Sequence, residues 1–431
     1  MRYSLQASEE AGHEICQDLN DGNPLGASVT QSNVDNGVRV TSAGAFLGRQ
    51  HHYENVTIVT GALASRLVFH GHRIVGVEIL RAEEQQDAQP ILVHAKEEVI
   101  LTAGSFQTPQ LLLLSGIGPA SHLSSLGIPV IQNLPAVGVN MQDHSALSCE
   151  FVVKPEIVSH NQLLNDARAL KEATAEYQSS HTGPLAVFGC SAAVLFPRLD
   201  GVLRSPEMEN LLHAQRTFIE AKHRPSTEIW MHSGPLLYTG PCPPDASVLC
   251  IEGLCQNNLS RGSLHLSSRD PRRLPIISPE YLSHSYDLRV AKETLREILR
   301  LTETPSFSSI IESVLQGPRS AHDQSKLSSS DADDTVLEKF VRENLTQGFH
   351  AMSTCVMGAS TEPNRVVGPD FQVQGIQGLR IADMSVCPIL TSNHTQVNAY
   401  LIGERCAEMI IADTYRSKVG DPYPHGFQSN L

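Results

Sequence analysis

Hydrophobic and polar residues alternate along residues 56–80, and the period changes further along the chain. The run VTIVTGALASRLVFHGHRIVGVEIL alternates on both sides of the tight HGHR turn, which predicts strands of a small sheet joined by a hairpin. The apolar run EEVILTA at 97–103 predicts a buried strand. The QTPQLLLLSG segment at 107–116 then predicts a helix capped by Thr108, begun by Pro109 and ended near Gly116.

Two later segments have the period of helices. Residues 287–303 predict a helix with one apolar face, made of Leu288, Ala291, Leu295, Ile298 and Leu299. A final helix is predicted from the segment VNAYLIGERCAEMIIAD, which follows the possible cap TSN. Strands and helices therefore mix along the chain, which indicates an α/β protein.

Length and charge narrow the class of protein. A chain of 431 residues is too long for one ordinary domain, and two interleaved domains are expected. The net charge of −14 argues against nucleic acid or an anionic membrane as partner. No apolar run approaches the roughly 20 residues of a membrane span. Nine scattered cysteines without C-x-x-C pairs argue against a zinc site, and no metal ligand is predicted.

The compartment stays open. The first residues, MRYSLQASEEAGHEICQDLN, contain no apolar segment of a signal peptide. Four N-x-S/T sequons would suit a secreted protein, but such short motifs also arise by chance.

Two histidines near the end stand in unusual surroundings. His350 lies in QGFHAMSTCVMG, a segment too broken for a regular core helix, and His394 comes directly before the final predicted helix. Free N–H groups and the dipole at such a helix start favour negative charge. A neutral imidazole there can accept a proton from an alcohol while hydride leaves the carbon. With nineteen histidines in the chain, spacing alone does not separate this pair from structural histidines.

Four stretches resemble the glucose–methanol–choline (GMC) flavin oxidoreductases. EEVILTAGSFQTPQLLLLSGIGPASHLSSLGIPVIQNLPAVGVNMQDH resembles the long second signature of that family. GFHAMSTCVMG, IQGLRIADMSVCP and SNHTQVNAYLIGERCAEMI resemble its C-terminal block in order and spacing. The resemblance implies FAD as cofactor, a small-molecule alcohol as substrate, and oxygen or another electron acceptor.

The same resemblance implies how the chain is divided. Residues 1–145 would be the remainder of a discontinuous FAD-binding domain with an inserted small sheet. Residues 146–345 would form mainly a substrate domain with an antiparallel sheet, and 346–431 the C-terminal block of the FAD domain. No G-x-G-x-x-G occurs in the sequence, so we expect an N-terminally truncated member that lacks the glycine-rich unit holding the FAD pyrophosphate.

Roles carry over from the family residue by residue. His350 matches the histidine that takes the substrate hydroxyl proton, and His394 matches the second member of that pair. The cofactor positions matched by the resemblance are Ala64, Ala103, Gly104, Asp383, Thr395, Gln396 and Val397. Ala64 stands where the family more often has valine, a change that a backbone contact to adenine tolerates.

Three functions are compatible with these residues. The first is oxidation of a primary or secondary alcohol, for which likeness to fungal members points to secondary metabolism. The second is a non-redox cyclase or lyase that uses the histidines as acid and base. The third is an inactive fragment or interaction protein. Both histidines and the helix cap favour the first two, whereas the missing glycine-rich unit argues against autonomous redox activity.

Overall fold

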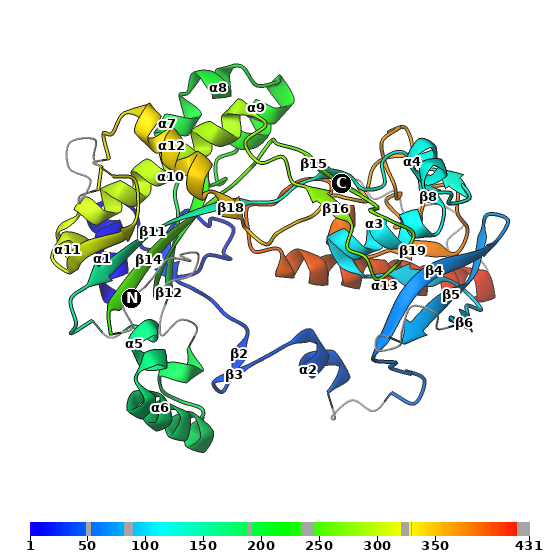
Figure 1. The fold of residues 1–431 in the computed structure, drawn as a ribbon, viewed down its shortest axis with the longest axis horizontal. Coiled ribbons are helices and arrows are strands. Elements are labelled where there is room, and N and C mark those ends of the chain that lie inside the picture. The colour runs from blue at the N-terminus through cyan, green and yellow to red at the C-terminus, as the bar shows by residue number, and fades with distance from the viewer. Residues whose placement is uncertain are drawn as a thin grey trace. The chain divides into compact units, whose positions relative to one another are not determined.

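The computed structural model describes residues 1–48, 53–81, 89–157, 159–187, 192–234, 245–319, 327–328 and 330–419 (Figure 1). The chain divides into two compact units, and each unit is discontinuous in sequence. Unit 1 consists of residues 1–57, 144–259 and 282–348, and unit 2 of 58–143, 260–281 and 349–431. The assignment of FAD binding and substrate binding to parts of the chain stays a prediction.

Short strands and helices alternate in both units. The helices and strands of unit 1 are, in chain order, α1 (Arg2–Glu10), β1 (Gly26–Val29), β2 (Val34–Asp35), β3 (Val38–Arg39), α2 (Ser42–Leu47), β11 (Ser145–Val153), α5 (His160–Asn165), α6 (Ala167–Ser180), η1 (Pro184–Ala186), β12 (Ala192–Phe196), α7 (Asp200–Leu203), α8 (Pro206–Glu209), α9 (His213–Glu220), β13 (Thr227–Ser233), β14 (Ser247–Cys255), α10 (Ser285–Glu303), α11 (Pro305–Ser308), β17 (Ile311–Gln316), α12 (Asp334–Asn344) and β18 (Thr346–Gln347). Those of unit 2 are β4 (Ala62–His70), β5 (Arg73–Arg81), β6 (Ile91–His94), β7 (Val99–Leu101), α3 (Gly104–Leu114), β8 (Ile117–Gly118), α4 (Ala120–Ser125), β9 (Gln132–Asn133), β10 (Val139–Met141), β15 (Gly262–His265), β16 (Ile276–Ser278), β19 (Leu379–Ile381), η3 (Met384–Val386) and α13 (Gln396–Val419).

A seven-stranded antiparallel sheet organises unit 1. Its order is β1-β12-β13-β14-β11-β17, and β18 also pairs with β11. Alternate residues such as Phe151, Ile229 and Ile251 point to the face that forms the core of this unit. The next residues along the same strands, among them Glu150 and Glu252, lie on the other face because strand side chains alternate. The antiparallel sheet expected in the middle of the chain is therefore present, with β1 from the N-terminal segment added at its edge.

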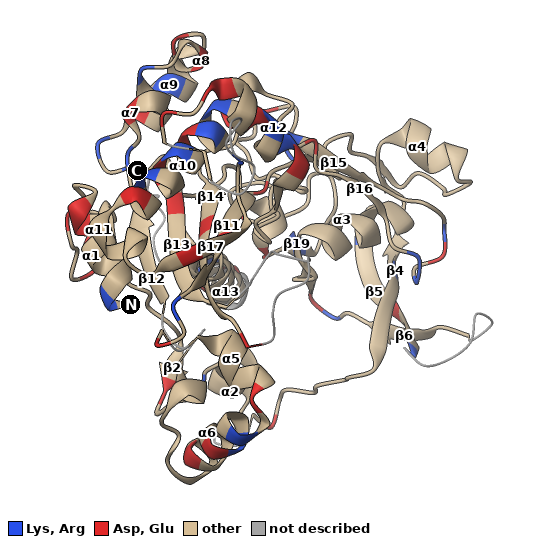
Figure 2. Cartoon of the chain, turned by 60° about the vertical axis from the view of Figure 1, so that its left-hand side comes forward, with Lys and Arg blue, Asp and Glu red and all other residues tan. Residues whose placement is uncertain are grey.

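Helix α10 packs against this sheet, as its apolar spacing predicts. Ala291, Leu295, Ile298 and Leu299 are fully buried in the same core as the sheet residues. The helix begins after His284, whose side chain accepts the Tyr286 N–H at 3.2 Å. Lys and Arg alternate with Asp and Glu on the rest of this helix (Figure 2), so its remaining faces are polar.

Unit 2 contains the predicted hairpin. β4 and β5 pair antiparallel from Ala62 opposite Arg81 to His70 opposite Arg73, with β6 at the far edge of β5. Gly71, with φ of +60°, supplies the left-handed turn residue between the two strands. The predicted strand at 97–103 is β7, which pairs in parallel with β19.

The predicted start of the helix after β7 is wrong. Helix α3 begins at Gly104, and Pro109 lies inside it, so Thr108 is an internal residue and not the cap. The predicted end is confirmed, because the helix stops at Leu114 and Gly116 follows with φ of +85°. The reason for the earlier start lies in long-range contacts of the first turn, described below.

Helix α13 begins at Gln396, within two residues of His394, as the capping pattern predicts. The Ala399 N–H bonds to the Thr395 carbonyl at 3.1 Å, which puts Thr395 at the cap position. No helix in the described part of the chain is both long and apolar enough to cross a membrane.

Candidate functional site

Two parallel strands of unit 2 end side by side and bring three predicted cofactor residues together. β7 leads to Ala103 and Gly104, and β19 leads to Asp383. The Asp383 Oδ2 accepts the Gly104 N–H at 3.0 Å, so the two strand ends are joined directly. The carboxyl ends of parallel strands are where ligands bind in open α/β sheets.

The Asp383 side chain accepts three hydrogen bonds within the protein. Its Oδ2 also accepts the Thr108 hydroxyl at 2.6 Å, and its Oδ1 accepts the Ser385 N–H at 2.8 Å as the cap of η3. This carboxylate therefore sits at the start of α3, where the helix dipole favours negative charge. What Asp383 can offer a cofactor is consequently its backbone.

Segment 350–354 holds the first turn of α3. Pro109 has no N–H, so the carbonyl of Ser105 four residues earlier lacks its helical donor. The Thr354 hydroxyl donates to this carbonyl at 2.6 Å, and the Ser105 hydroxyl donates to the Ala351 carbonyl at 2.6 Å. These contacts allow the helix to begin at Gly104 despite the internal proline.

His350 and His394 lie next to each other, as their predicted pairing requires. Their ring centroids are 5.1 Å apart with an angle of 70° between the planes, an edge-to-face arrangement. His350 is half-buried and His394 is exposed. One imidazole of the pair is therefore largely removed from water while its neighbour faces the solvent.

Burial and the neighbouring ring lower the pKa of His350. Desolvation is the larger cause and His394 the second, and together they bring the pKa of His350 from 6.5 to about 4. The imidazole of His350 is thus uncharged at neutral pH. An uncharged imidazole can accept a proton.

Gln142 holds together the two segments that carry the histidines. It pairs with Met352 in a short antiparallel bridge, and its Nε2 donates to the Ser353 hydroxyl at 2.8 Å. Its Oε1 accepts the Leu390 N–H at 3.1 Å. Gln142 is 2% exposed, so this amide is a buried connector between the segment after His350 and the segment before His394.

Asp143 and Tyr281 are two residues near His350 that the sequence pattern does not indicate. The Asp143 Oδ1 accepts the backbone N–H of His350 at 2.8 Å, and its Oδ2 accepts the Tyr281 hydroxyl at 2.5 Å. Asp143 stands in the quoted stretch VGVNMQDH, but nothing in the local pattern indicates that it reaches a residue 207 positions away.

The other predicted cofactor positions lie on α13 and β4 and not at the ends of the two parallel strands. Thr395, Gln396 and Val397 form the start of α13 beside His394, and the Val397 side chain is exposed. Ala64 is exposed on β4, opposite Ile79 of β5. β4 packs against α3, the helix that begins at Gly104.

The cysteines near the two histidines are buried thiols. Cys355 and Cys387 are buried, and desolvation raises the pKa of both thiols, which suits small core residues. Among the residues the structure describes, no group of three His, Cys, Asp or Glu side chains could hold a metal ion.

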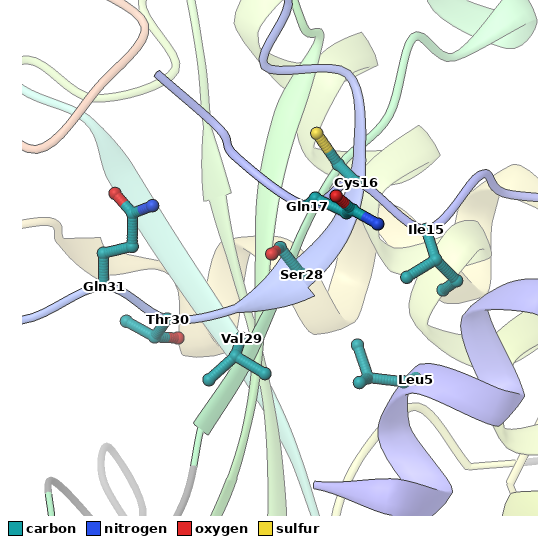
Figure 3. Close-up of a pocket in the computed structure, with 8 residues that line it drawn as sticks. All are labelled: Leu5, Ile15, Cys16, Gln17, Ser28, Val29, Thr30 and Gln31. Carbon is teal, nitrogen blue, oxygen red and sulfur yellow. The ribbon is translucent and has the colours of Figure 1, made fainter. Parts of the chain in front are cut away.

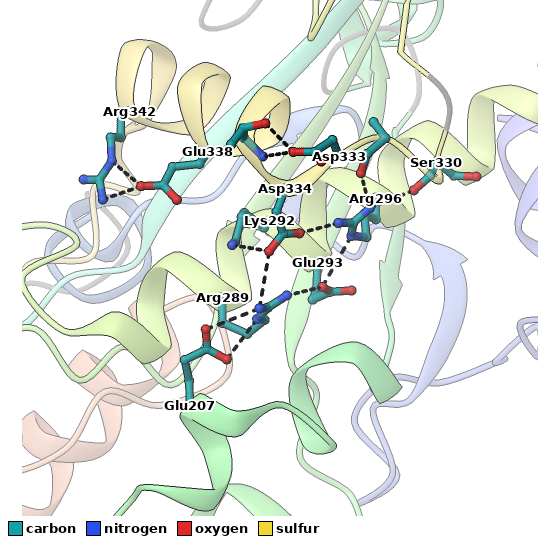
Figure 4. A network of polar contacts seen from close by, with 12 residues as sticks. Glu207, Arg289, Lys292, Glu293, Arg296, Ser330, Asp333, Asp334, Glu338 and Arg342 are labelled. Atoms are coloured by element: carbon teal, nitrogen blue, oxygen red, sulfur yellow. Dashed lines mark hydrogen bonds and ion pairs between the residues drawn. The ribbon is translucent and has the colours of Figure 1, made fainter.

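In the described part of unit 1, a cavity and a set of ion pairs are formed by residues other than the predicted site residues. A cavity of about 390 Å³ lies beside α1 and β1 and is lined by residues such as Leu5, Ile15 and Val29 (Figure 3). On α10, Arg289 pairs with Glu207 and Glu293, and Asp334 of α12 accepts from Lys292 at 2.6 Å (Figure 4). These ion pairs join helices to one another, which is a structural role.

Comparison with known proteins identifies two family models along the chain. The N-terminal model of GMC oxidoreductases matches residues 1–146, and the C-terminal model matches 258–403. The oxygen-dependent choline dehydrogenase of Rhizobium etli is 31% identical over 411 residues, covering 95% of this chain and 68% of that enzyme. Its counterpart from Brucella anthropi is 29% identical over 410 residues with the same coverage.

Solved structures agree with these sequence matches. A variant of formate oxidase from Aspergillus oryzae RIB40, studied for FAD modification, superposes with a TM-score of 0.83 at 26% identity, covering 96% of this chain and 70% of that chain. The predicted fold class is therefore confirmed. The N-terminal model matches from residue 1, so the comparisons do not support the prediction of a truncated family member.

Proposed function

Because this chain belongs to the GMC oxidoreductase family, we propose that it catalyses the FAD-dependent oxidation of a primary or secondary alcohol, with His350 as base. The observation that carries the proposal is the uncharged, half-buried imidazole of His350 beside the exposed His394. Two histidines 44 positions apart have been brought to 5.1 Å on the one unit that also holds the parallel strand ends.

His350 would take the hydroxyl proton of the alcohol. Because its pKa is lowered to about 4, the imidazole is uncharged across the neutral range, and an uncharged imidazole can accept a proton. His394 would orient the substrate hydroxyl toward His350, since its exposed ring faces the solvent from which an alcohol arrives. FAD, when bound, supplies the acceptor for the hydride, and oxygen or another acceptor would remove the electrons.

The residues at the strand ends are compatible with a bound FAD. A Cβ on Gly104 would meet no atom within 4 Å, so the backbone at the start of α3 is open to a close neighbour. We propose that the backbone of Ala103, Gly104 and Asp383 holds the nucleotide part. The start of α13, Thr395 to Val397, would face the flavin beside His394.

The first test is whether the chain retains FAD. The purified 431-residue chain is mixed with excess FAD, free cofactor is removed by gel filtration, and flavin absorbance is followed across the protein peak. The proposal expects flavin to travel with the folded protein. Folded protein without flavin would contradict autonomous redox activity of this chain.

The second test addresses His350. In the flavin-loaded protein, His350→Ala should leave the flavin spectrum unchanged and slow flavin reduction by an alcohol by a factor on the order of 10²–10⁴ in anaerobic stopped flow. The control is His94→Ala, which removes an exposed imidazole from β6. Equal rates in the two variants would remove His350 from the role of base.

A further inference from the structure

The backbone of His350 is anchored by a buried carboxylate that three distant parts of the chain share. Asp143 is 7% exposed and follows β10, whereas His350 comes after β18 and Tyr281 after β16. One carboxylate oxygen accepts the His350 N–H at 2.8 Å, and the other accepts the Tyr281 hydroxyl at 2.5 Å. All three residues belong to unit 2.

Both hydrogen bonds are of the strong kind. Each has an ionised acceptor, and such bonds are shorter and roughly twice as strong as those between neutral groups. Tyr281 remains a donor, because burial and the Asp143 charge raise the pKa of its hydroxyl. A carboxylate held from one side by Tyr281 cannot turn away from the His350 N–H without losing that bond.

Backbone strain occurs on both sides of this carboxylate. Phe349, directly before His350, has φ of +60°, and Glu280 and Leu282, on either side of Tyr281, have φ of +56° and +59°. Residues with a Cβ adopt this left-handed region at a cost and keep it only where surrounding contacts hold them. Asp143 accepts the backbone N–H of the residue after Phe349 and the side-chain hydroxyl of the residue between Glu280 and Leu282, so its carboxylate links these two parts of the chain.

We propose that Asp143 and Tyr281 are positioning residues for His350: the Tyr281–Asp143 hydrogen bond fixes the carboxylate, and the carboxylate fixes the His350 backbone and thereby the reach of its imidazole. This inference rests on the proposed function. A misplacement of about 1 Å in a catalytic group can cost on the order of 100-fold in rate, so an anchor of this kind affects catalysis without contacting the substrate. In this hydrogen bond the Asp143 carboxylate binds the backbone N–H of His350.

The structural half of the test needs no cofactor. Hydrogen exchange of the His350 amide is measured by NMR or by mass spectrometry with fragmentation in the chain without FAD. We expect Asp143→Ala to speed this exchange at least tenfold and Tyr281→Phe to speed it about threefold to tenfold. Asp143→Asn keeps an acceptor for the His350 N–H and should recover part of the protection. Tyr415→Phe, which removes an exposed hydroxyl from α13 of the same unit, should change nothing.

The catalytic half uses the flavin-loaded protein. Flavin reduction should slow by roughly 10–100-fold in Asp143→Ala and by less in Asp143→Asn and Tyr281→Phe, with the alcohol concentration at half-maximal rate changed less than twofold. If Asp143→Ala does not fold, amide exchange and flavin reduction are both measured in Asp143→Asn and Tyr281→Phe, with the effects expected above.

The possible failures are distinguishable. Unchanged exchange of the His350 amide in Asp143→Asn and Tyr281→Phe would overturn the anchor. Faster exchange with an unchanged reduction rate, while His350→Ala still abolishes reduction, would overturn the positioning role and leave the proposed function standing. Full reduction by His350→Ala would refute the proposed function and with it the catalytic half of this inference.

Discussion

Acidification from pH 7 to pH 5 should weaken unit 2 through His350. Its pKa in the folded protein is lowered from 6.5 to about 4, first by burial and then by His394. Between these two values the unfolded chain binds more protons than the folded chain at this site. The contribution of His350 to the free energy of unfolding is therefore complete above pH 6.5 and is lost as the pH falls. The loss levels off below pH 4.

The magnitude follows from the shift. One pKa unit corresponds to about 1.4 kcal/mol, so the full effect is ~3 kcal/mol, of which about 2 kcal/mol is expressed by pH 5. Because the ring is half-buried and not fully enclosed, solvent screening brings our expectation to roughly 1.5–2 kcal/mol. In His350→Gln this part of the pH dependence should disappear.

The assay must report on unit 2. The single tryptophan, Trp230, lies on β13 of unit 1, so its fluorescence would follow the wrong unit. Hydrogen exchange of the α3 amides measures the opening free energy of unit 2 directly. We would compare pH 7 and pH 5 for the unmodified chain, for His350→Gln, and for His94→Gln as a control on an exposed β6 histidine.

The comparison between variants decides the outcome. The unmodified chain and the His94→Gln control should lose roughly 1.5–2 kcal/mol more than His350→Gln on going from pH 7 to pH 5. An equal loss in all three proteins would refute the burial argument for His350. So would an NMR titration in which the His350 ring protonates near its ordinary value of 6.5.

Three further predictions concern the framework that holds the site. Asp383→Ala should lower the free energy of unfolding by roughly 2–4 kcal/mol, because three donors in or near the core lose their acceptor. Urea melts followed by far-UV circular dichroism measure this loss, and a loss below about 1 kcal/mol would contradict the prediction. Gly116→Ala should cost more than 2 kcal/mol in the same melts, since its Cβ would stand 2.3 Å from a backbone oxygen, whereas Gly61→Ala, which has left-handed φ but open space, should cost about 1 kcal/mol. Thr354→Val should lower the free energy of unfolding by about 1–2 kcal/mol. This loss should be smaller in the Pro109→Ala background, where residue 109 regains an N–H that can donate to the Ser105 carbonyl. Equal losses in both backgrounds would show that Thr354 and Pro109 are not coupled.

Elements set by local periodicity could be predicted from the sequence. Helix α10 shows its buried face every three to four residues, and the β4–β5 hairpin shows alternation around a glycine turn. In both cases the information lies within about 20 consecutive residues. Helix α10 begins two residues before the predicted segment and ends with it, whereas β4 begins at Ala62, six residues after the predicted start at 56.

The local sequence does not predict the start of α3, because the residues that fix it lie far away along the chain. Thr108 followed by Pro109 is a good local signal for a helix start. In the structure, Asp383 and Thr354 satisfy groups in the preceding turn, and the helix extends five residues further back than the local signal allows. No window of consecutive residues contains that information.

The candidate site also contains residues that the sequence indicates and residues that only the structure reveals. The family resemblance points to His350 and His394, whose ring centroids lie 5.1 Å apart, and their catalytic role stays a prediction. Asp143 and Tyr281 were missed because the contacts they make span 207 and 138 positions. Periodicity and spacing reveal residues that act within one element, whereas an anchor between segments becomes visible only in three dimensions.

A single short segment serves both the strand-end site and the histidine pair. Within residues 350–354, the Ala351 carbonyl and the Thr354 hydroxyl bind Ser105 at the start of α3, while the His350 N–H binds Asp143. These contacts follow one another along a chain of five residues, so a displacement at one end must be absorbed within a few backbone dihedrals. The helix start proposed to hold the nucleotide and the imidazole proposed to take the proton are consequently held by one common support. The segment is irregular because backbone groups that a helix would pair internally, among them the N–H groups of His350, Met352 and Ser353, bind other segments.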